Sequence, residues 1–362
     1  MTQLRTVQVL GGGSAGSGAH VRSLASGLVA RGVRVTVCAP AGLEHVYDFP
    51  GAGAHFAPVP RRSDPAAVGA LRAACARADV VHAHGLHAAV RASVALSGLR
   101  VPLVVTWHSR PDADGPRGPL LRLLERRAAR AAAVVLGTCS ELVDRARGHG
   151  ARDARLAPVA VPAPRRAERS EGKARAELGA VDRPLVMAVG SLAPQRGYGT
   201  LLDAAARWRA VDPLPLVVIA GEGRERAALQ RRIEAEGLPV RLVGRRDDVG
   251  DLISAADVAV LPSRWEARAL LAQEALRAGV PLVATAVGGV PELVGDAAEL
   301  VPYGDGDALA EAVARLLRDP ARRDELVAAG RAQAATWPTE DETIAQVLSV
   351  YDELTAGSAP LA

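Results

Sequence analysis

Cysteine, aromatic residues and long apolar runs are all scarce in this chain of 362 residues. Its three cysteines, Cys38, Cys75 and Cys139, form no C-x-x-C pair, which argues against a disulfide framework and a zinc ribbon. No window reaches the roughly 18 uncharged apolar residues of a membrane span, and no basic segment followed by an apolar run opens the chain. We therefore expect a soluble, cytoplasmic protein.

Lysine is also nearly absent, because all but one of the 44 basic residues are arginine. The net charge is only +4, and the arginines are spread along the chain between acidic residues. Aromatic residues make up 3% of the chain, so no basic patch is interleaved with rings that could stack on nucleobases. We expect no nucleic-acid partner.

One basic segment, LLRLLERRAARAAAVV at residues 120–135, combines leucines and arginines at helical spacing. A helix lying on a membrane surface has this pattern, which would give a peripheral contact at the inner face of the membrane. A helix with its leucines facing the core and its arginines facing water has the same pattern. We favour the second interpretation and keep the membrane contact as the alternative.

The chain alternates short apolar runs with segments of helical periodicity. Such runs suit parallel strands buried on both faces. The alternation begins at TVQVL (6–10) and restarts after a polar, proline-bearing stretch at 157–179. The length and the repeat predict two Rossmann-like, doubly wound α/β domains. Ligands of such sheets bind beyond the carboxyl ends of the strands, so we expect the chemistry in a crevice between the domains.

A glycine-rich loop, Gly11 to Gly18, follows the first expected strand and opens a helix. Its backbone N–H groups and the helix N-terminus are suited to cradle a phosphate. Several registers match G-x-G-x-x-G, but the acid that a dinucleotide-binding dehydrogenase needs about 20 residues further on is missing. An oxidoreductase is thus disfavoured, and a purely structural turn remains an alternative.

Histidines gather at the ends of two expected strands. VHAHGLH contains His82, His84 and His87, and His108 ends the segment VPLVVTWH. No cysteine or carboxylate joins the first three locally, so we favour a polar rim for a substrate over a metal site. A neutral imidazole at His108 would bind a sugar hydroxyl or position reacting groups. An ordinary loop histidine is the alternative there.

The most specific pattern lies at residues 256–294, where Glu266 and Glu274 are eight residues apart within P-S-x-x-E-x7-E-A-x-x-x-G-x-P-x-V-A-x-x-x-G-G-x-P-E. The first glutamate is expected in a loop and the second in the following helix. This spacing allows one carboxylate to meet a sugar and the other a ribose, with the helix N-terminus facing a phosphate between them.

With these residues the sequence resembles the retaining family-4 glycosyltransferases of the GT-B fold, over nearly its whole length. The resemblance is carried by the pattern at 256–294 and by further segments: the GGG loop with His20, VHAH, TWH at 106–108, GSLAPQRG at 190–197, IAGEG at 219–223 and VRLVGR at 240–245. It implies a GT-B chain with an acceptor-binding domain at 1–165, a nucleotide-sugar-binding domain at 180–337 and a helix at about 338–356 that crosses back to the first domain.

The resemblance also implies the reaction, which moves a hexose from a UDP- or GDP-linked donor to an acceptor hydroxyl with retention of configuration. It implies neither a metal nor a separate cofactor. The catalytic residues would be His108, Arg196 and Glu266. The donor would be bound by Gly12, Gly13, Ser191, Arg196, Arg245, Glu266, Arg268, Ala269, Leu270 and Glu274. The acceptor would lie near the same two glycines, His20 and His84.

Among these positions, Ser191 and Arg196 stand where the family pattern usually supplies an arginine and a lysine to neutralise the diphosphate. One cation is therefore missing, and Arg268 is a candidate to replace it. The missing charge keeps a second interpretation open, in which the protein binds a nucleotide sugar or a partner without turnover. A nucleotide-sugar epimerase is a third.

Overall fold

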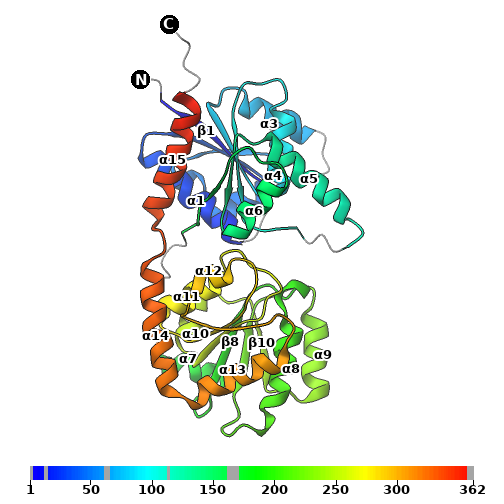
Figure 1. The fold of residues 1–362 in the computed structure, drawn as a ribbon, viewed down its shortest axis with the longest axis vertical. Coiled ribbons are helices and arrows are strands. Elements are labelled where there is room, and N and C mark those ends of the chain that lie inside the picture. Colours follow the sequence, from blue (N-terminus) through cyan, green and yellow to red (C-terminus); the bar gives the residue numbers. More distant parts are fainter. Residues whose placement is uncertain (1–2, 12–14, 61–65, 112–114, 161–170, 357–362) are drawn as a thin grey trace. The chain divides into compact units, whose positions relative to one another are not determined.

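The computed structural model describes residues 3–11, 15–60, 66–111, 115–160 and 171–356. The chain divides into two compact units (Figure 1). The first combines Met1–Val161 with Pro338–Ala362, and the second is Pro162–Trp337. The helix α7 therefore lies in the second unit, before the start at residue 180 that the sequence suggested. The crevice between two domains stays a prediction.

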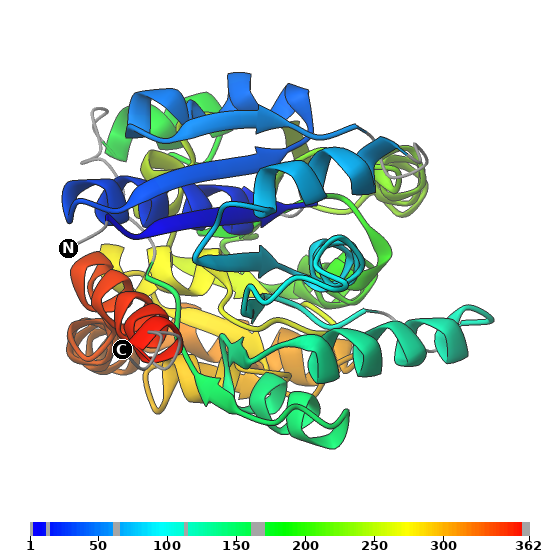
Figure 2. The same cartoon turned by 90° about the horizontal axis from the view of Figure 1, so that it is seen from above.

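The first unit contains a parallel sheet in the order β3-β2-β1-β4-β5-β6-β7. Strands β1 and β2 run side by side in the same direction in the view of Figure 2. The order reverses between β1 and β4, so ligands are expected where these two strands end. The strands are β1 Arg5–Leu10, β2 Arg34–Ala39, β3 His55–Pro58, β4 Val80–His84, β5 Leu103–Trp107, β6 Val134–Gly137 and β7 Ala154–Leu156.

Helix α15 covers this sheet together with α1 although the two are far apart in sequence (Figure 1). Ile344 and Tyr351 of α15 are buried in the same core as Val21 and Leu24 of α1. The helices of this unit are α1 Ala15–Ala30, α2 Glu44–Tyr47, α3 Ala66–Cys75, α4 Leu86–Ala95, α5 Gly118–Ala131, α6 Ser140–Gly148 and α15 Glu340–Ala356, with 3₁₀ turns η1 Ala41–Leu43 and η2 Pro50–Ala52.

The second unit contains another parallel sheet in the order β10-β9-β8-β11-β12-β13, which reverses between β8 and β11. Its strands are β8 Leu185–Val189, β9 Leu216–Ala220, β10 Val240–Gly244, β11 Val258–Leu261, β12 Leu282–Thr285 and β13 Glu299–Val301. Its helices are α7 Glu171–Leu178, α8 Tyr198–Arg207, α9 Arg226–Glu236, α10 Val249–Ser254, α11 Leu270–Ala278, α12 Val290–Val294, α13 Gly306–Arg318 and α14 Pro320–Ala335, with 3₁₀ turns η3 Pro194–Arg196 and η4 Trp208–Ala210.

Strand β8 shows why this sheet forms. Successive side chains of a strand point to opposite faces. Leu185 and Met187 enter the core beneath α7, α10 and α11, whereas Val186 and Ala188 enter the core beneath α8, α9 and α13. A continuous apolar run is therefore buried on both faces, and the α/β doubly wound prediction is confirmed for both units.

The prediction that the leucines of helix α5 face the core is wrong for two of the four, Leu120 and Leu123, whereas Leu121 and Leu124 are half-buried. Leu120 is 56% exposed and Leu123 is 62% exposed. The helix is buried through Glu125, Ala128 and Ala129 instead, because small side chains allow it to lie close to its neighbours. The helices that the structure describes include none that is long and apolar enough to cross a membrane.

Candidate functional site

In the second unit, the loops after β8 and β11 bring Arg196 and Glu266 together at the point where the strand order reverses. Nη1 of Arg196 donates to Oε1 of Glu266 in an ion pair. The hydroxyl of Ser263 donates to the same carboxylate oxygen at 2.9 Å. Nε of Arg196 is buried without a hydrogen-bond partner among the described residues.

Gly197 makes this meeting of the two loops possible. Its φ is +68°, which favours glycine, and a Cβ at this position would lie 1.8 Å from the carbonyl oxygen of Pro262. Any side chain would therefore push the loop that carries Arg196 away from the strand end that leads to Glu266.

The N-terminus of α11 follows Glu266 directly. Ala269 is the N-cap residue and offers no side-chain oxygen to the first-turn amides, and the first turn contains no acidic residue. Helix α11 therefore presents unsatisfied N–H donors and the positive end of its dipole. Ala267 and Ala269 are buried, Arg268 is half-buried and Leu270 is 37% exposed. A phosphate group is the ligand that such an N-terminus binds.

Glu274 lies in α11 and is half-buried. Its carboxylate has no hydrogen bond or salt bridge to any residue in the described part of the chain. Burial raises its pKa, and Arg277 partly opposes this shift. The adjacent Gln273 is fully buried, and neither polar atom of its side chain has a hydrogen-bond partner among the described residues. Two neighbouring side chains of α11, Gln273 and Glu274, therefore have polar atoms without hydrogen-bond partners among the described residues.

The structure does not bring the remaining donor-site candidates into this set of contacts. Ser191 and Arg245 are both exposed, and the side-chain hydrogen bonds of Glu266 within the described part of the chain go to Arg196 and Ser263 instead. Gly12 and Gly13 lie outside the described residues.

In the first unit, His20, His84 and His108 come together at the ends of β4 and β5. The ring of His20 makes T-shaped contacts with the other two rings, which stack on each other, and the centroid distances are 5.3 to 5.6 Å. Nδ1 of His84 lies 3.3 Å from Nε2 of His108. Burial is the main cause that lowers the pKa of each of these histidines, to about 4 for His20 and well below the ordinary value for the other two. All three imidazoles are therefore neutral at pH 7.

Sequence analysis missed the polar residues beneath this cluster. Nε2 of His84 and Oε1 of Gln8 are 3.0 Å apart. Nε2 of Gln8 donates to the hydroxyl of Tyr351 at 3.0 Å, and that hydroxyl lies 2.6 Å from Nδ1 of His82. The other nitrogen of His82 lies 2.7 Å from the hydroxyl of Thr106. The signal that could have revealed this network is a lone glutamine, Gln8, in the apolar strand TVQVL.

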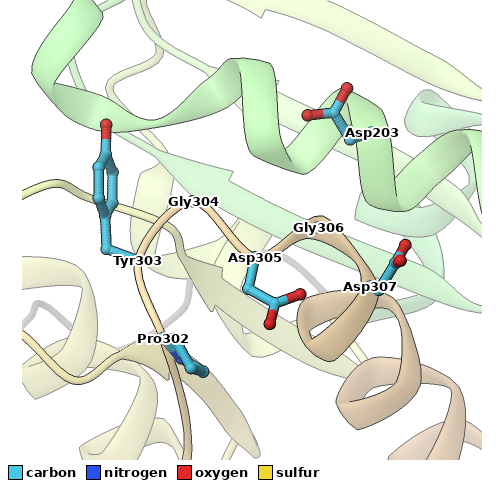
Figure 3. Close-up of a pocket in the computed structure, with 7 residues that line it drawn as sticks. All are labelled: Asp203, Pro302, Tyr303, Gly304, Asp305, Gly306 and Asp307. Atoms are coloured by element: carbon cyan, nitrogen blue, oxygen red, sulfur yellow. The ribbon is translucent and has the colours of Figure 1, made fainter.

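A pocket of about 580 Å³ lies elsewhere in the second unit, between α8 and the loop before α13 (Figure 3). Its lining includes Asp203, Asp305 and Asp307 but none of the residues predicted for the site. Asp203 pairs with Arg232, Asp307 pairs with Arg207, and Asp305 caps α13. The partners of these three carboxylates are therefore arginines and a helix N-terminus, which gives them a structural role.

Comparisons with known proteins identify the relatives of this chain. The family "Glycosyl transferase 4-like domain" matches residues 15–162, and the family "Glycosyl transferases group 1" matches residues 170–333. D-inositol 3-phosphate glycosyltransferase of Salinispora arenicola is 31% identical over 329 residues, which cover 81% of this chain and 73% of that protein. Alpha-D-kanosaminyltransferase of Streptomyces kanamyceticus is 34% identical over 254 residues, but this chain spans only 64% of its length.

Among solved structures, HepE of Anabaena in complex with UDP superposes with a TM-score of 0.82 at 18% identity. The superposition covers 97% of this chain and all of HepE, which shows a shared fold. The family matches on both units, the relatives above 30% identity and the shared fold lead to one conclusion. This chain belongs to the GT4-type glycosyltransferases with the GT-B fold.

Proposed function

We propose that this protein transfers a hexose from a nucleoside diphosphate sugar to an acceptor hydroxyl, with retention of configuration and without a metal ion at the diphosphate. The bond from the anomeric carbon to the diphosphate breaks, a bond to the acceptor oxygen forms on the same face, and the departing diphosphate takes the acceptor's proton. The observation that carries this proposal is the Arg196–Glu266 pair beside the uncapped N-terminus of α11.

The second unit would bind the donor sugar nucleotide. The first-turn amides of α11 and the partly exposed guanidinium of Arg196 would stabilise the charge that develops on the diphosphate. Glu274 would accept hydrogen bonds from the ribose, since no protein group holds its carboxylate within the described residues. Glu266 would bind the hexose hydroxyls, and its fixed position between Arg196 and Ser263 means that little reorganisation is needed.

The first unit would bind the acceptor through His20 and His84, and His108 would position the hexose. Neutral imidazoles suit this role because they both donate and accept hydrogen bonds. The polar network of Gln8, Tyr351 and His82 would hold His84 in one tautomer.

Arg268 would supply the diphosphate cation that Ser191 does not. It is half-buried and immediately precedes the N-cap of α11. Arg268→Ala should lower the turnover of donor about 10- to 100-fold, the loss expected from one charge-assisted phosphate contact. The exposed Arg224 of the same unit provides the control, and Arg224→Ala should leave turnover unchanged. Unchanged turnover in Arg268→Ala would remove this residue from the proposal.

A thermal-shift screen against UDP, GDP and their hexose conjugates, followed by transfer assays with and without EDTA, tests the function. A donor at 100 times its Kd should stabilise the folded protein by about 2.7 kcal/mol. Transfer that persists in EDTA supports the metal-independent reaction. Stabilisation by none of these nucleotides would overturn the proposal. HepE, which was solved with UDP, makes uridine nucleotides the first to be tested.

Catalytic degeneracy is the second candidate, and the exposed Ser191 at the end of β8 favours it. A degenerate protein would bind a nucleotide sugar tightly and show no turnover across a broad acceptor panel. An epimerase would instead convert the donor sugar with no acceptor present.

We also propose that α5 contacts an anionic membrane surface, because it exposes Leu120 and Leu123 beside arginines. The double variant Leu120→Ser/Leu123→Ser should lose cosedimentation with phosphatidylglycerol vesicles. Val46→Ser is the control, since Val46 is 61% exposed on a different helix of the same unit. Equal cosedimentation of the double variant and the wild type would refute the contact.

A further inference from the structure

The histidine cluster of the first unit brings three ring nitrogens close enough to one another to bind one metal ion. One ring nitrogen from each of His20, His84 and His108 lies within 4.8 Å of the other two. Nδ1 of His84 and Nε2 of His108 are 3.3 Å apart. Two nitrogens bound to one tetrahedral zinc ion, with bonds of 2.0 to 2.1 Å, are separated by about 3.4 Å. His20 lies within 4.8 Å of both nitrogens and is the third ligand of the set.

The surroundings of His84 prepare its Nδ1 for a metal. The side-chain amide of Gln8 donates to the hydroxyls of Tyr351 and Thr6, so its Oε1 is the atom that faces Nε2 of His84. Nε2 of His84 must then carry the proton, and Nδ1 retains its lone pair. Histidines that bind metals are commonly oriented in this way, by a hydrogen bond from the second ring nitrogen to an oxygen.

The three histidines are not equally buried, and the cluster is accessible from the side of His108. His20 and His84 are almost fully buried, whereas His108 is partly exposed. Three protein ligands with access on one side leave a fourth position for water or another small ligand. Neutral imidazoles favour zinc, cobalt, nickel or copper over magnesium and calcium, which prefer oxygen ligands.

We propose that His20, His84 and His108 bind one zinc ion through three ring nitrogens, and that this ion inhibits sugar transfer. The inhibition rests on the proposed function, in which His84 and His108 contact the acceptor and the hexose. A bound metal occupies the same ring nitrogens. The ion is thus a regulator and takes no part at the diphosphate, so the transfer reaction itself remains independent of metal.

Titration of the full chain, without an affinity tag, with Co²⁺ tests the site directly. One equivalent should produce the intense visible absorption of tetrahedral cobalt, and zinc should remove it. His20→Ala and His108→Asn should each weaken cobalt binding by more than roughly 10- to 100-fold, which is the loss typical when a residue that only hydrogen-bonds to a metal ligand is removed. His45→Ala and His55→Ala are matched controls, since both histidines are exposed in the same unit, and they should bind as the wild type does.

Circular dichroism of each variant distinguishes loss of a ligand from loss of folding, and His108→Asn remains informative if His20→Ala does not fold. Absence of a cobalt spectrum in the wild-type protein would overturn the site. Binding that survives both substitutions would overturn it as well. Zinc that binds at the site and leaves transfer unaffected would overturn the inhibition. The cobalt titration needs no substrate, so a failure of the proposed transferase activity would leave its result standing.

Discussion

Two carboxylates of the candidate site occupy different surroundings although they are only eight residues apart. Glu266 is held by Arg196 and Ser263. Glu274 is half-buried, and no hydrogen bond or salt bridge from the described residues holds it. Burial disfavours the charged form of an acid, which is why the pKa of Glu274 rises.

This shift predicts how stability depends on pH. Above the ordinary pKa of 4.5 and up to its own raised pKa, folded Glu274 keeps a proton that the unfolded chain has lost. The folded state binds more protons in this window, so the free energy of unfolding falls as pH rises through it. Glu274→Gln should remove that fall, because glutamine does not titrate. Urea unfolding of the variant and the wild type at steps from about pH 4 to 7 measures the difference, and parallel curves would contradict the prediction.

At the scale of the element, α5 shows that a helix is not always held by its most apolar residues. Glu125 is 2% exposed and accepts two hydrogen bonds of 2.7 Å from Arg145 of α6. Nε2 of His149 lies 3.4 Å from the same carboxylate. This bidentate pair joins α5 to α6 while two leucines of α5 remain in solvent.

Removing one partner of this pair should destabilise the first unit. Glu125→Ala leaves Arg145 without its buried partner, and we expect a loss of about 3 kcal/mol in the free energy of unfolding. Asp144→Ala removes the exposed ion pair with Arg147 on the same helix and should cost no more than about 0.5 kcal/mol. Denaturant unfolding measures both variants. Equal losses would show that burial does not determine the strength of this pair.

At the scale of the whole molecule, the last helix belongs to the unit in which the chain begins. Helix α15 packs against α1, and the contact depends on Gly27, where a Cβ would lie 2.0 Å from Cδ1 of Ile344. The hydroxyl of Tyr351 on the same helix accepts a hydrogen bond from Gln8 and lies within hydrogen-bond distance of Nδ1 of His82. The C-terminal segment therefore supports the histidine cluster.

Gly27→Ala should destabilise the protein by about 1 to 3 kcal/mol through overpacking, although alanine normally stabilises a helix. In the Ile344→Ala background the same change should be neutral or stabilising, because the obstructing side chain is gone. Gly69→Ala in α3 is the control, since a Cβ there meets nothing within 4 Å. Calorimetric unfolding of the four variants measures the coupling, and an additive result would disprove the contact.

The sequence by itself determined the two runs of alternating strands and helices, because the periods of strands and helices are local properties of the chain. It also placed Glu266 in a loop and Glu274 in the next helix, because Glu266 lies between strand β11 and the N-terminus of α11, and Glu274 lies within α11. These features require no knowledge of which distant segments meet. The GT-B fold followed from them together with the resemblance.

Only the tertiary structure decided which distant residues meet. Arg196 and Glu266 are 70 residues apart in sequence, and Gln8 and Tyr351 are 343 apart. His20 meets His84 and His108 through the packing of a helix on a sheet. Leu120 and Leu123 of α5 are exposed, whereas Glu125 of the same helix is buried and pairs with Arg145. Contacts of this kind depend on strand order and on helix packing, and no local pattern of residues encodes either.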